Sequence, residues 1–190
     1  MLLEITANAA LAVSAVLAGR NSIHTWWTGA IACALFALLY ARTQLYASVA
    51  LQLFLIATCA VGWWRWRRHE LQPVRELGRG KPVYLWAAAA TGGLAALAYG
   101  TMLSRTTDAH APFADSLVLM FSVIAQLLQM RRRVESWWFW IAVNLVAVPL
   151  YFSRGLYPTS LLYVGLLANA ILALRHWQAL HARPHESARA

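Results

Sequence analysis

Charged residues are scarce in this chain. They make up 12% of its 190 residues, whereas hydrophobic residues make up 61%. A soluble globular domain carries about 25% charged residues, because its folded surface must be wetted by water. The composition therefore excludes an ordinary soluble domain and predicts a protein whose solvent is lipid.

Cysteine is almost absent, and so are the usual marks of catalysis. Cys33 and Cys59 both fall in apolar stretches with no further cysteine at a metal-ligand spacing, so neither a zinc site nor a disulfide scaffold is predicted. The chain also lacks a phosphate-cradling glycine loop, a Ser/His/Asp arrangement and paired carboxylates beside its apolar stretches. We expect no metal, no cofactor and no enzymatic activity.

Acidic residues are outnumbered by basic ones, 7 to 16, which gives a formal net charge of +9. The basic residues lie between apolar stretches and form no stripe with aromatic residues, so a nucleic acid partner is not expected. Glu4 and Asp115 are the acids that fall within apolar stretches, both near one end. Two interpretations stay open for them, a functional ionisable group in lipid and a charge that stabilises a helix start.

Long apolar stretches dominate what the chain does contain. A helix that crosses the hydrocarbon core needs about 20 mostly apolar residues, since lipid offers the backbone no hydrogen-bond partners. The stretches that meet this requirement lie at residues 2–19, 26–42, 45–66, 83–103, 114–130, 137–153 and 157–177. We therefore predict an all-α membrane protein with seven transmembrane helices.

The basic residues also predict the orientation of these helices. Cytoplasmic loops carry an excess of Lys and Arg. With the amino terminus outside and the carboxyl terminus in the cytoplasm, Arg42, Arg105 and Arg154 are external, and the cytoplasmic set is Arg20, Arg65, Arg67, Arg68, Arg75, Arg79, Lys81, Arg131, Arg132, Arg133, Arg175, Arg183 and Arg189. The opposite orientation, or an even number of spans, would scramble this separation.

An internal repeat appears when the sequence is shifted against itself by 111 residues. The shift aligns aromatic pairs without any gap, among them Trp26/Trp137, Trp27/Trp138, Tyr40/Tyr151, Tyr46/Tyr157 and Trp66/Trp177. Glu4 falls on Asp115 in the same frame. Each repeat holds three predicted spans, so the two share one orientation only if a further span separates them.

These constraints predict a 3+1+3 architecture. Its parts are a first three-helix bundle at 1–66, a basic cytoplasmic loop at 67–82, a linking helix at 83–103, a second bundle at 104–177 and a cytoplasmic tail at 178–190. Parallel three-helix repeats joined by an inverting helix are the plan of SWEET-type carriers, whose substrate binds near mid-membrane between the repeats. The plan indicates transport.

Tryptophans and amides supply candidate binding residues. Trp63 and Trp66, like Trp137 and Trp140, are three residues apart and share a helix face, so each pair could present two indoles to a cavity. Amides such as Gln52, Gln126 and Asn144 can hydrogen-bond a neutral polar ligand. An interfacial aromatic belt and structural bonds between helices are the alternative roles.

The segment Gly62-Trp63-Trp64-Arg65-Trp66 resembles the end of the third helix in the PnuC family of bacterial nicotinamide riboside transporters. The resemblance extends over roughly residues 2–177 and includes Asn21 with Trp26 and Gly29, Leu51-Gln52, Asp115-Ser116, Ala125-Gln126, Glu135 with Trp137, Trp140 and Asn144, and Gly155-Leu156-Tyr157. It implies the 3+1+3 fold, a homotrimer in the bacterial inner membrane and a cytoplasmic kinase that traps the substrate.

The resemblance also implies roles for single residues. Tryptophans would frame the pyridine or ribose, and amides would bind its hydroxyls; the residues concerned are Trp63, Trp66, Trp137, Trp140, Gln126 and Asn144, with Gln52 a weaker candidate. Arg65 departs from the family pattern, which often has glutamine there, and a cation in the cavity would repel a pyridinium. Arg65 could instead extend outward to the headgroups.

The substrate and the mode of transport stay open at this point. Relatives of the PnuC type are also associated with thiamin and riboflavin, and a neutral flavin would tolerate Arg65 better. The absence of an ion-coupling cluster favours a facilitator that works by alternating access. A SWEET-like sugar carrier and a membrane scaffold without transport activity are the remaining hypotheses.

Overall fold

A computed structural model describes residues 2–42, 46–68, 82–106, 111–153, 155 and 157–186. The secondary-structure elements in these residues are α-helices. Seven α-helices account for most of this part, and the chain divides into two compact units, Met1–Gln72 and Pro73–Ala190. Helices are the expected elements, because a helix satisfies its backbone N–H and C=O groups internally where lipid cannot.

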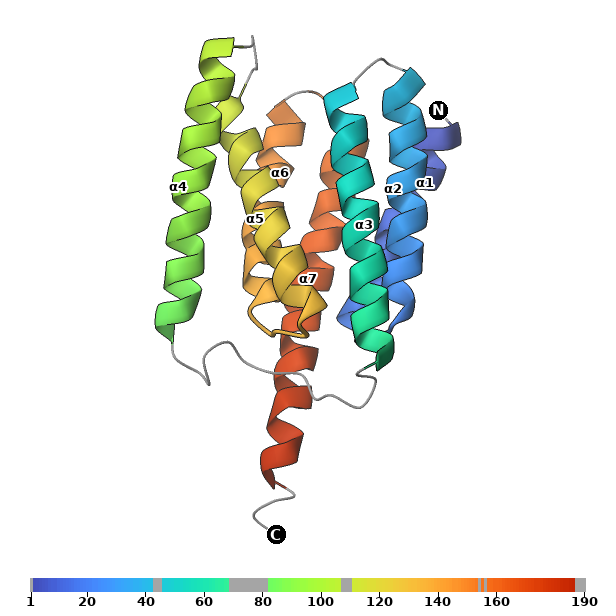
Figure 1. The fold of residues 1–190 in the computed structure, drawn as a ribbon, viewed down its shortest axis with the longest axis vertical. Coiled ribbons are helices and arrows are strands. Elements are labelled where there is room, and N and C mark those ends of the chain that lie inside the picture. Colours follow the sequence, from blue (N-terminus) through green and yellow to red (C-terminus); the bar gives the residue numbers. More distant parts are fainter. Residues whose placement is uncertain are drawn as a thin grey trace. The chain divides into compact units, whose positions relative to one another are not determined.

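Unit 1 consists of α1 (Leu2–Gly19), α2 (His24–Arg42) and α3 (Tyr46–Arg68). Helix α2 packs against both α1 and α3 (Figure 1). Small residues let the helices approach, since a Cβ added at Gly29 would lie 3.0 Å from Ser14 Oγ of α1 and 3.4 Å from Cys59 Sγ of α3. Two hydrogen bonds, which we call the Ser14 and Thr25 clasp, also join α1 to α2. The Ser14 hydroxyl donates to the Thr25 carbonyl at 2.8 Å, and the Thr25 hydroxyl donates to the Ser14 carbonyl at 2.9 Å.

A tight turn reverses the chain between α1 and α2. Asn21 adopts a left-handed conformation with φ 54°, which asparagine tolerates better than most residues. Its N–H donates to the Ala18 carbonyl at 2.9 Å, and the Ser22 N–H donates to the Leu17 carbonyl at 2.9 Å. These bonds satisfy carbonyls that the end of α1 would otherwise leave unpaired.

Unit 2 consists of α4 (Pro82–Thr106), α5 (Pro112–Met130), α6 (Ser136–Ser153) and α7 (Tyr157–Glu186), each packed against the next. Helix α4 approaches α5 at Gly92, where an added Cβ would lie 2.5 Å from Ile124 Cδ1. A core of Ala125, Leu128 and Phe139 fills the space between α5 and α6 and is covered by Leu85, Ala88 and Ala89 of α4.

The turn between α5 and α6 repeats the turn of unit 1. Arg132 is left-handed with φ 51°, and its N–H donates to the Gln129 carbonyl at 2.9 Å. The Arg133 N–H donates to the Leu128 carbonyl at 3.0 Å. Arg132 and Gln129 stand 111 positions after Asn21 and Ala18, and Arg133 and Leu128 stand 111 positions after Ser22 and Leu17. The repeat in the sequence is therefore also a repeat of backbone geometry.

Among the described residues, five helices are long and apolar enough to cross a membrane, and α3 is not one of them; the five segments are Leu2–Gly19, Val83–Thr106, Pro112–Met130, Ser136–Ser153 and Tyr157–His181. The apolar part of α2, His24–Leu39, is shorter. Large apolar side chains point outward, with Trp86 70% and Leu161 72% exposed. Because contiguous exposure of this kind is costly in water and favourable in lipid, the chain is a multi-pass membrane protein.

The helix ends agree closely with the predicted spans except at α7. That helix runs on to Glu186, nine residues past the predicted end at 177, and it extends beyond the ends of α4, α5 and α6 (Figure 1). An established helix gains one backbone bond for most further residues, so the polar segment after Trp177 continues it, although Pro184 has no N–H to donate. Most of the loop predicted at 67–82 and the last residues of the tail at 178–190 lie outside the described residues.

Candidate functional site

A pair of buried tryptophans joins α2 to α3 in unit 1. Trp26 and Trp66 are 2% and 1% exposed, and their rings meet edge to face with centroids 5.3 Å apart. Gly62 provides the room, because a Cβ there would lie 2.5 Å from the Trp26 ring. The glycine of the Gly62-Trp63-Trp64-Arg65-Trp66 segment thus seats a tryptophan from the neighbouring helix.

Unit 2 contains the equivalent pair between α6 and α7. Trp137 and Trp177 are 2% and 0% exposed, and their centroids are 5.6 Å apart at an interplanar angle of 77°. Edge-to-face contact places the positive edge of one ring on the negative face of the other. Both members stand 111 positions after Trp26 and Trp66, so the repeat preserves a contact between helices as well as residue types.

The indole nitrogens of Trp26 and Trp137 are buried and have no hydrogen-bond acceptor among the described residues. A buried N–H without a partner costs about 1–3 kcal/mol, so such groups are uncommon unless a ligand or water uses them. The same atom is affected at equivalent positions of the two repeats. These two nitrogens are therefore candidate donors to a bound molecule.

Trp140 differs from Trp137, although both were predicted to frame the ligand. The Trp140 indole is half-buried, and its N–H donates to Gln129 Oε1 of α5 at 2.8 Å. Its ring packs against the core of Ala125, Leu128 and Phe139. Trp140 can offer a ring face to a ligand, whereas its N–H is already engaged.

Asn144 completes one face of α6. It is 4% exposed, and its side-chain N–H donates to the Trp140 carbonyl at 2.8 Å. Its other N–H and its oxygen take no part in this bond. Positions 137, 140 and 144 share a helix face, and we call this set, Trp137, Trp140 and Asn144, the α6 polar face.

The remaining predicted residues lie on α5 and α3. Gln126 is half-buried on α5 and has a partner of its own within the structure. Gln52 is 9% exposed on α3. Trp63, three positions before Trp66, is 40% exposed, and the Arg67 guanidinium stacks 5.2 Å from its ring centroid. Arg65 is exposed.

Comparison with known proteins supplies the context for this geometry. The model of the nicotinamide mononucleotide transporter family matches residues 1–179 of the 190. The chain belongs to this family. Its members are transporters and not enzymes, in agreement with the expectation drawn from the missing catalytic motifs. The family resemblance noted in the sequence is confirmed.

Individual relatives of this transporter differ in the vitamin they are named for. The nicotinamide riboside transporter PnuC of Escherichia coli is 28% identical over 187 residues, which span 85% of this chain and 78% of that protein. The riboflavin/roseoflavin transporter RibM of Streptomyces davaonensis is 29% identical over 173 residues, 87% of this chain and 79% of that protein. The chain is thus similar both to riboside and to flavin carriers.

A solved structure has the same fold as this family member. The crystal structure of the vitamin B3 transporter PnuC matches with a TM-score of 0.75 at 23% identity, over 96% of this chain and 83% of that one. The agreement supports the helical architecture described above.

Some residues of the transporter's candidate site were missed by prediction. Trp26 and Trp177 were aligned by the repeat but not expected to contact Trp66 and Trp137. Gln129 was one of the amides noted within the predicted spans, but it was not carried into the predicted site. The 111-residue shift could have indicated these contacts. Both repeats have tryptophan at the same two positions, Trp26 and Trp66 in the first and Trp137 and Trp177 in the second, which suggests that the two positions are in contact.

The two cysteines and the acids Glu4 and Asp115 of this family member lie within helices. Cys33 and Cys59 are not joined in a disulfide. No group of three or more His, Cys, Asp or Glu side chains occurs among the described residues. Glu4 and Asp115 lie in the first turns of α1 and α5, where negative charge stabilises a helix start.

Proposed function

We propose that this transporter carries nicotinamide riboside across the bacterial inner membrane. Membership of the family supports a vitamin-type substrate, and similarity to the E. coli riboside transporter favours the riboside. Similarity to RibM makes riboflavin the second candidate. Thiamin and a simple sugar are weaker alternatives that the same experiment separates.

The observation that carries the proposal is the α6 polar face. Trp137 supplies a buried N–H that has no acceptor among the described residues, and Asn144 supplies a buried amide of which one N–H binds the Trp140 carbonyl. The two are seven residues apart on one face, which corresponds to roughly 10 Å along a helix. That separation suits a ligand with polar groups at both ends of a flat body, such as a nucleoside, with the Trp140 ring between them.

The predicted ligand residues are distributed unequally over the two repeats. On the first two helices of the second repeat stand Gln126, Trp137, Trp140 and Asn144, and the equivalent residues of the first repeat are Ala15, Trp26, Gly29 and Cys33. We assign the principal polar contacts to the second repeat. Trp66, Gln52 and the more exposed Trp63, all on α3, are the proposed ligand residues of the first repeat.

We further propose that the helices have the 3+1+3 arrangement of SWEET-type carriers. Equivalent turns at Asn21 and Arg132, and equivalent tryptophan pairs, support two units of the same design. Helix α4, which packs on α5, would then be the inverting helix. The distribution of arginines supports an external amino terminus and a cytoplasmic carboxyl terminus.

The proposed transport is facilitated and proceeds by alternating access. The carrier would open to one side of the membrane at a time, and a cytoplasmic kinase would phosphorylate the vitamin so that it cannot leave. The protein would work as a homotrimer, as the family resemblance implies. No gradient-driven step is included, because Glu4 and Asp115 both sit at helix starts rather than in a polar cluster.

A thermal-shift screen followed by uptake measurements tests this proposal. Purified protein is heated with nicotinamide riboside, riboflavin, thiamin or glucose, and the riboside is expected to raise the melting temperature most. Proteoliposomes should then equilibrate labelled riboside without accumulating it. Accumulation driven by a proton or sodium gradient would disprove the facilitator, and stabilisation by riboflavin alone would reassign the substrate.

A further inference from the structure

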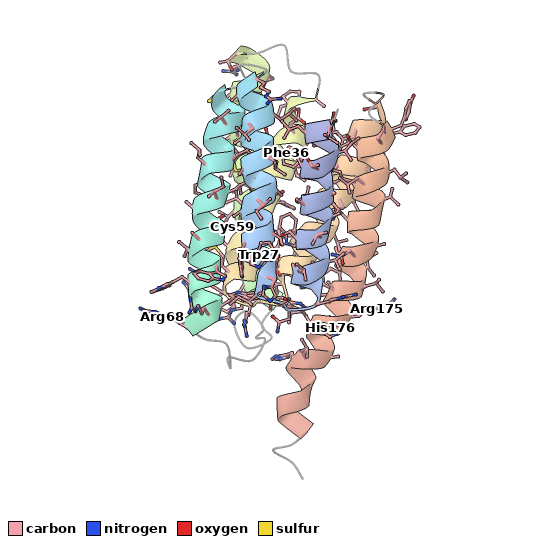
Figure 2. All side chains as sticks on the ribbon, turned by 90° about the vertical axis from the view of Figure 1, so that its right-hand side faces the viewer. Trp27, Phe36, Cys59, Arg68, Arg175 and His176 are labelled. Atoms are coloured by element: carbon pink, nitrogen blue, oxygen red, sulfur yellow. The ribbon has the colours of Figure 1, made fainter. Side chains whose placement is uncertain are left out.

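The end of α3 carries two arginines stacked on tryptophan rings. The Arg68 guanidinium lies 4.1 Å from the centroid of the Trp64 ring, and that of Arg67 lies 5.2 Å from the Trp63 ring. Trp64 is 51% exposed, and Arg65, Arg67 and Arg68 are all exposed. Figure 2 places Arg68 at the terminus of α3. We call Trp64, Arg65, Arg67 and Arg68 the α3 basic end.

Stacking prepares these arginines to bind a phosphate. A guanidinium that lies on an indole ring keeps its N–H groups at its edge, where they match the oxygens of a phosphate in a bidentate fashion. The ring also restricts the side chain before any ligand arrives, so less entropy is lost on binding. The helix dipole favours arginines near a helix end but requires no ring beside them.

Among the described residues near the α3 basic end the charges are positive, whereas Glu70 follows Arg68 closely in the sequence and lies outside the described residues. Among the described residues of unit 1, Glu4 is the one acidic residue, and it lies in the first turn of α1. Helix α1 runs from Glu4 towards the turn at Asn21, and α3 ends near that turn because the helices alternate in direction (Figure 1). Glu4 therefore lies at the opposite end of the unit, and Arg20 adds an exposed positive charge near the basic end.

The sequence of α3 places these groups at the depth of the lipid headgroups. Residues 49–61 are apolar except for Gln52 and Thr58, tryptophans follow at Trp63 and Trp64, and arginines follow them. Apolar, aromatic and cationic side chains occur in this order from the bilayer core to the headgroups. A ligand phosphate met at this depth belongs to a phospholipid.

We infer that the α3 basic end binds the phosphate of an anionic phospholipid such as phosphatidylglycerol. The inference depends on α3 crossing the membrane and not on the identity of the vitamin. Helix α7 provides an internal comparison, because the residues equivalent to Trp64, Arg67 and Arg68 are Arg175, Gln178 and Ala179. Arg175 is exposed on α7 (Figure 2), and no cation–π contact is found for it among the described residues.

Native mass spectrometry of the full chain, titrated with phosphatidylglycerol, tests this site. A lysine or arginine near an anionic surface contributes about 1 kcal/mol, so Arg68→Gln is expected to weaken lipid binding about five-fold and Arg67→Gln with Arg68→Gln about thirty-fold. Arg175→Gln, which removes the same charge from α7, is expected to change binding less than two-fold. An equal loss in Arg175→Gln would overturn the site in favour of diffuse attraction.

The variant Trp64→Leu tests whether lipid binding requires the stacked arginine or only the net positive charge. It leaves every charge in place and removes the ring beneath Arg68, so binding should weaken about three-fold, as the loss of an exposed cation–π contact predicts. Unchanged binding in Trp64→Leu would overturn the proposal. Trp64→Leu alters no charge and Arg175→Gln alters only charge. Comparing lipid binding of these two variants therefore distinguishes the site from net charge even if the double arginine variant fails to fold.

Two further ligands identify the source of the phosphate. Phosphatidylcholine has a phosphate with a compensating cation and should bind much more weakly than phosphatidylglycerol. Inorganic phosphate should not displace the bound lipid. Equal binding of phosphatidylcholine, or displacement by inorganic phosphate, would contradict an anionic lipid site. None of these readouts involves the vitamin, so a wrong substrate assignment would leave them unaffected.

Discussion

The first and second three-helix repeats share their backbone design but differ in their polar groups. Both have a left-handed residue in the first turn and an edge-to-face tryptophan pair between the second and third helices. The first repeat joins its first two helices by the Ser14 and Thr25 clasp. The second repeat does so by the bond from Trp140 to Gln129, where the first repeat has Gly29 and Ala18.

This difference shows which features the duplication needed to keep. Turns and tryptophan pairs specify how three helices pack, and each repeat must pack. Polar side chains inside a bundle can move to another helix turn without loss of the fold, since one bond replaces another. The second repeat carries large polar side chains at positions where the first has small ones, and it is therefore the better candidate for recognition.

The largest expected difference between the repeats comes from alanine substitutions at two equivalent positions. Asn144→Ala removes the buried amide from the α6 polar face and is expected to weaken nicotinamide riboside binding about thirty- to a hundred-fold, the cost of an unpaired buried group. Cys33→Ala, the same change at the equivalent position of α2, should leave affinity unchanged. Isothermal titration of both variants gives the answer, with melting curves in the absence of ligand to confirm folding. Equal effects would refute the unequal roles of the repeats.

The next prediction concerns the tryptophan pairs. Gly62→Ala places a Cβ 2.5 Å from the buried Trp26 ring and should destabilise the protein by about 2 kcal/mol, a typical cost of overpacking. The second repeat already has Ala173 at this position, so its pair tolerates a methyl group. Denaturant or thermal unfolding in detergent measures the change. Stability equal to that of the unmodified chain would mean that the two pairs are seated alike.

A third prediction addresses α4, which the first repeat lacks. Gly92→Ala would bring a Cβ to 2.5 Å from Ile124 Cδ1, the end of a flexible side chain, so a cost of about 1 kcal/mol is expected. Gly93→Ala is the matched control, because nothing lies within 4 Å of its added Cβ and the helix gains propensity. The same unfolding assay applies. A larger loss in Gly93→Ala than in Gly92→Ala would contradict the contact between α4 and α5.

The smallest effect is expected at the clasp of the first repeat. Ser14→Ala removes the bond to the Thr25 carbonyl and recreates the residue that the second repeat has at Ala125. Hydrogen bonds between membrane helices contribute about 0.6 kcal/mol on average, so a loss of this order is predicted in unfolding experiments. A loss several times greater would show that the first repeat depends on its polar link more than the second.

Much of the helical fold was predictable from the sequence because its causes are local. Apolar length fixes a helix that must satisfy its own backbone, and the ends of α2 and α5 lie within two residues of the prediction. The continuation of α7 to Glu186 was missed, because polar residues in a segment do not stop a helix that has already formed.

The candidate site was less predictable, since contacts between helices decide it. Trp63 and Trp66 share a helix face by spacing, yet one is 40% and the other 1% exposed, because Trp66 meets Trp26. Trp137 and Trp140 differ likewise in whether the indole N–H is engaged. Periodicity gives the direction of a side chain, whereas its partner depends on residues far away in the sequence.

The length of α7 has a mechanical consequence. From Trp177 to Glu186 the helix rises roughly 14 Å beyond the buried tryptophan pair, at about 1.5 Å per residue. A continuous helix transmits tilt along its axis, so this extension acts as a lever whose free end moves further than the part among the other helices. A label on exposed Gln178 or Ala179 would amplify small reorientations of the second repeat, and movement during a transport cycle could be followed there without touching the vitamin.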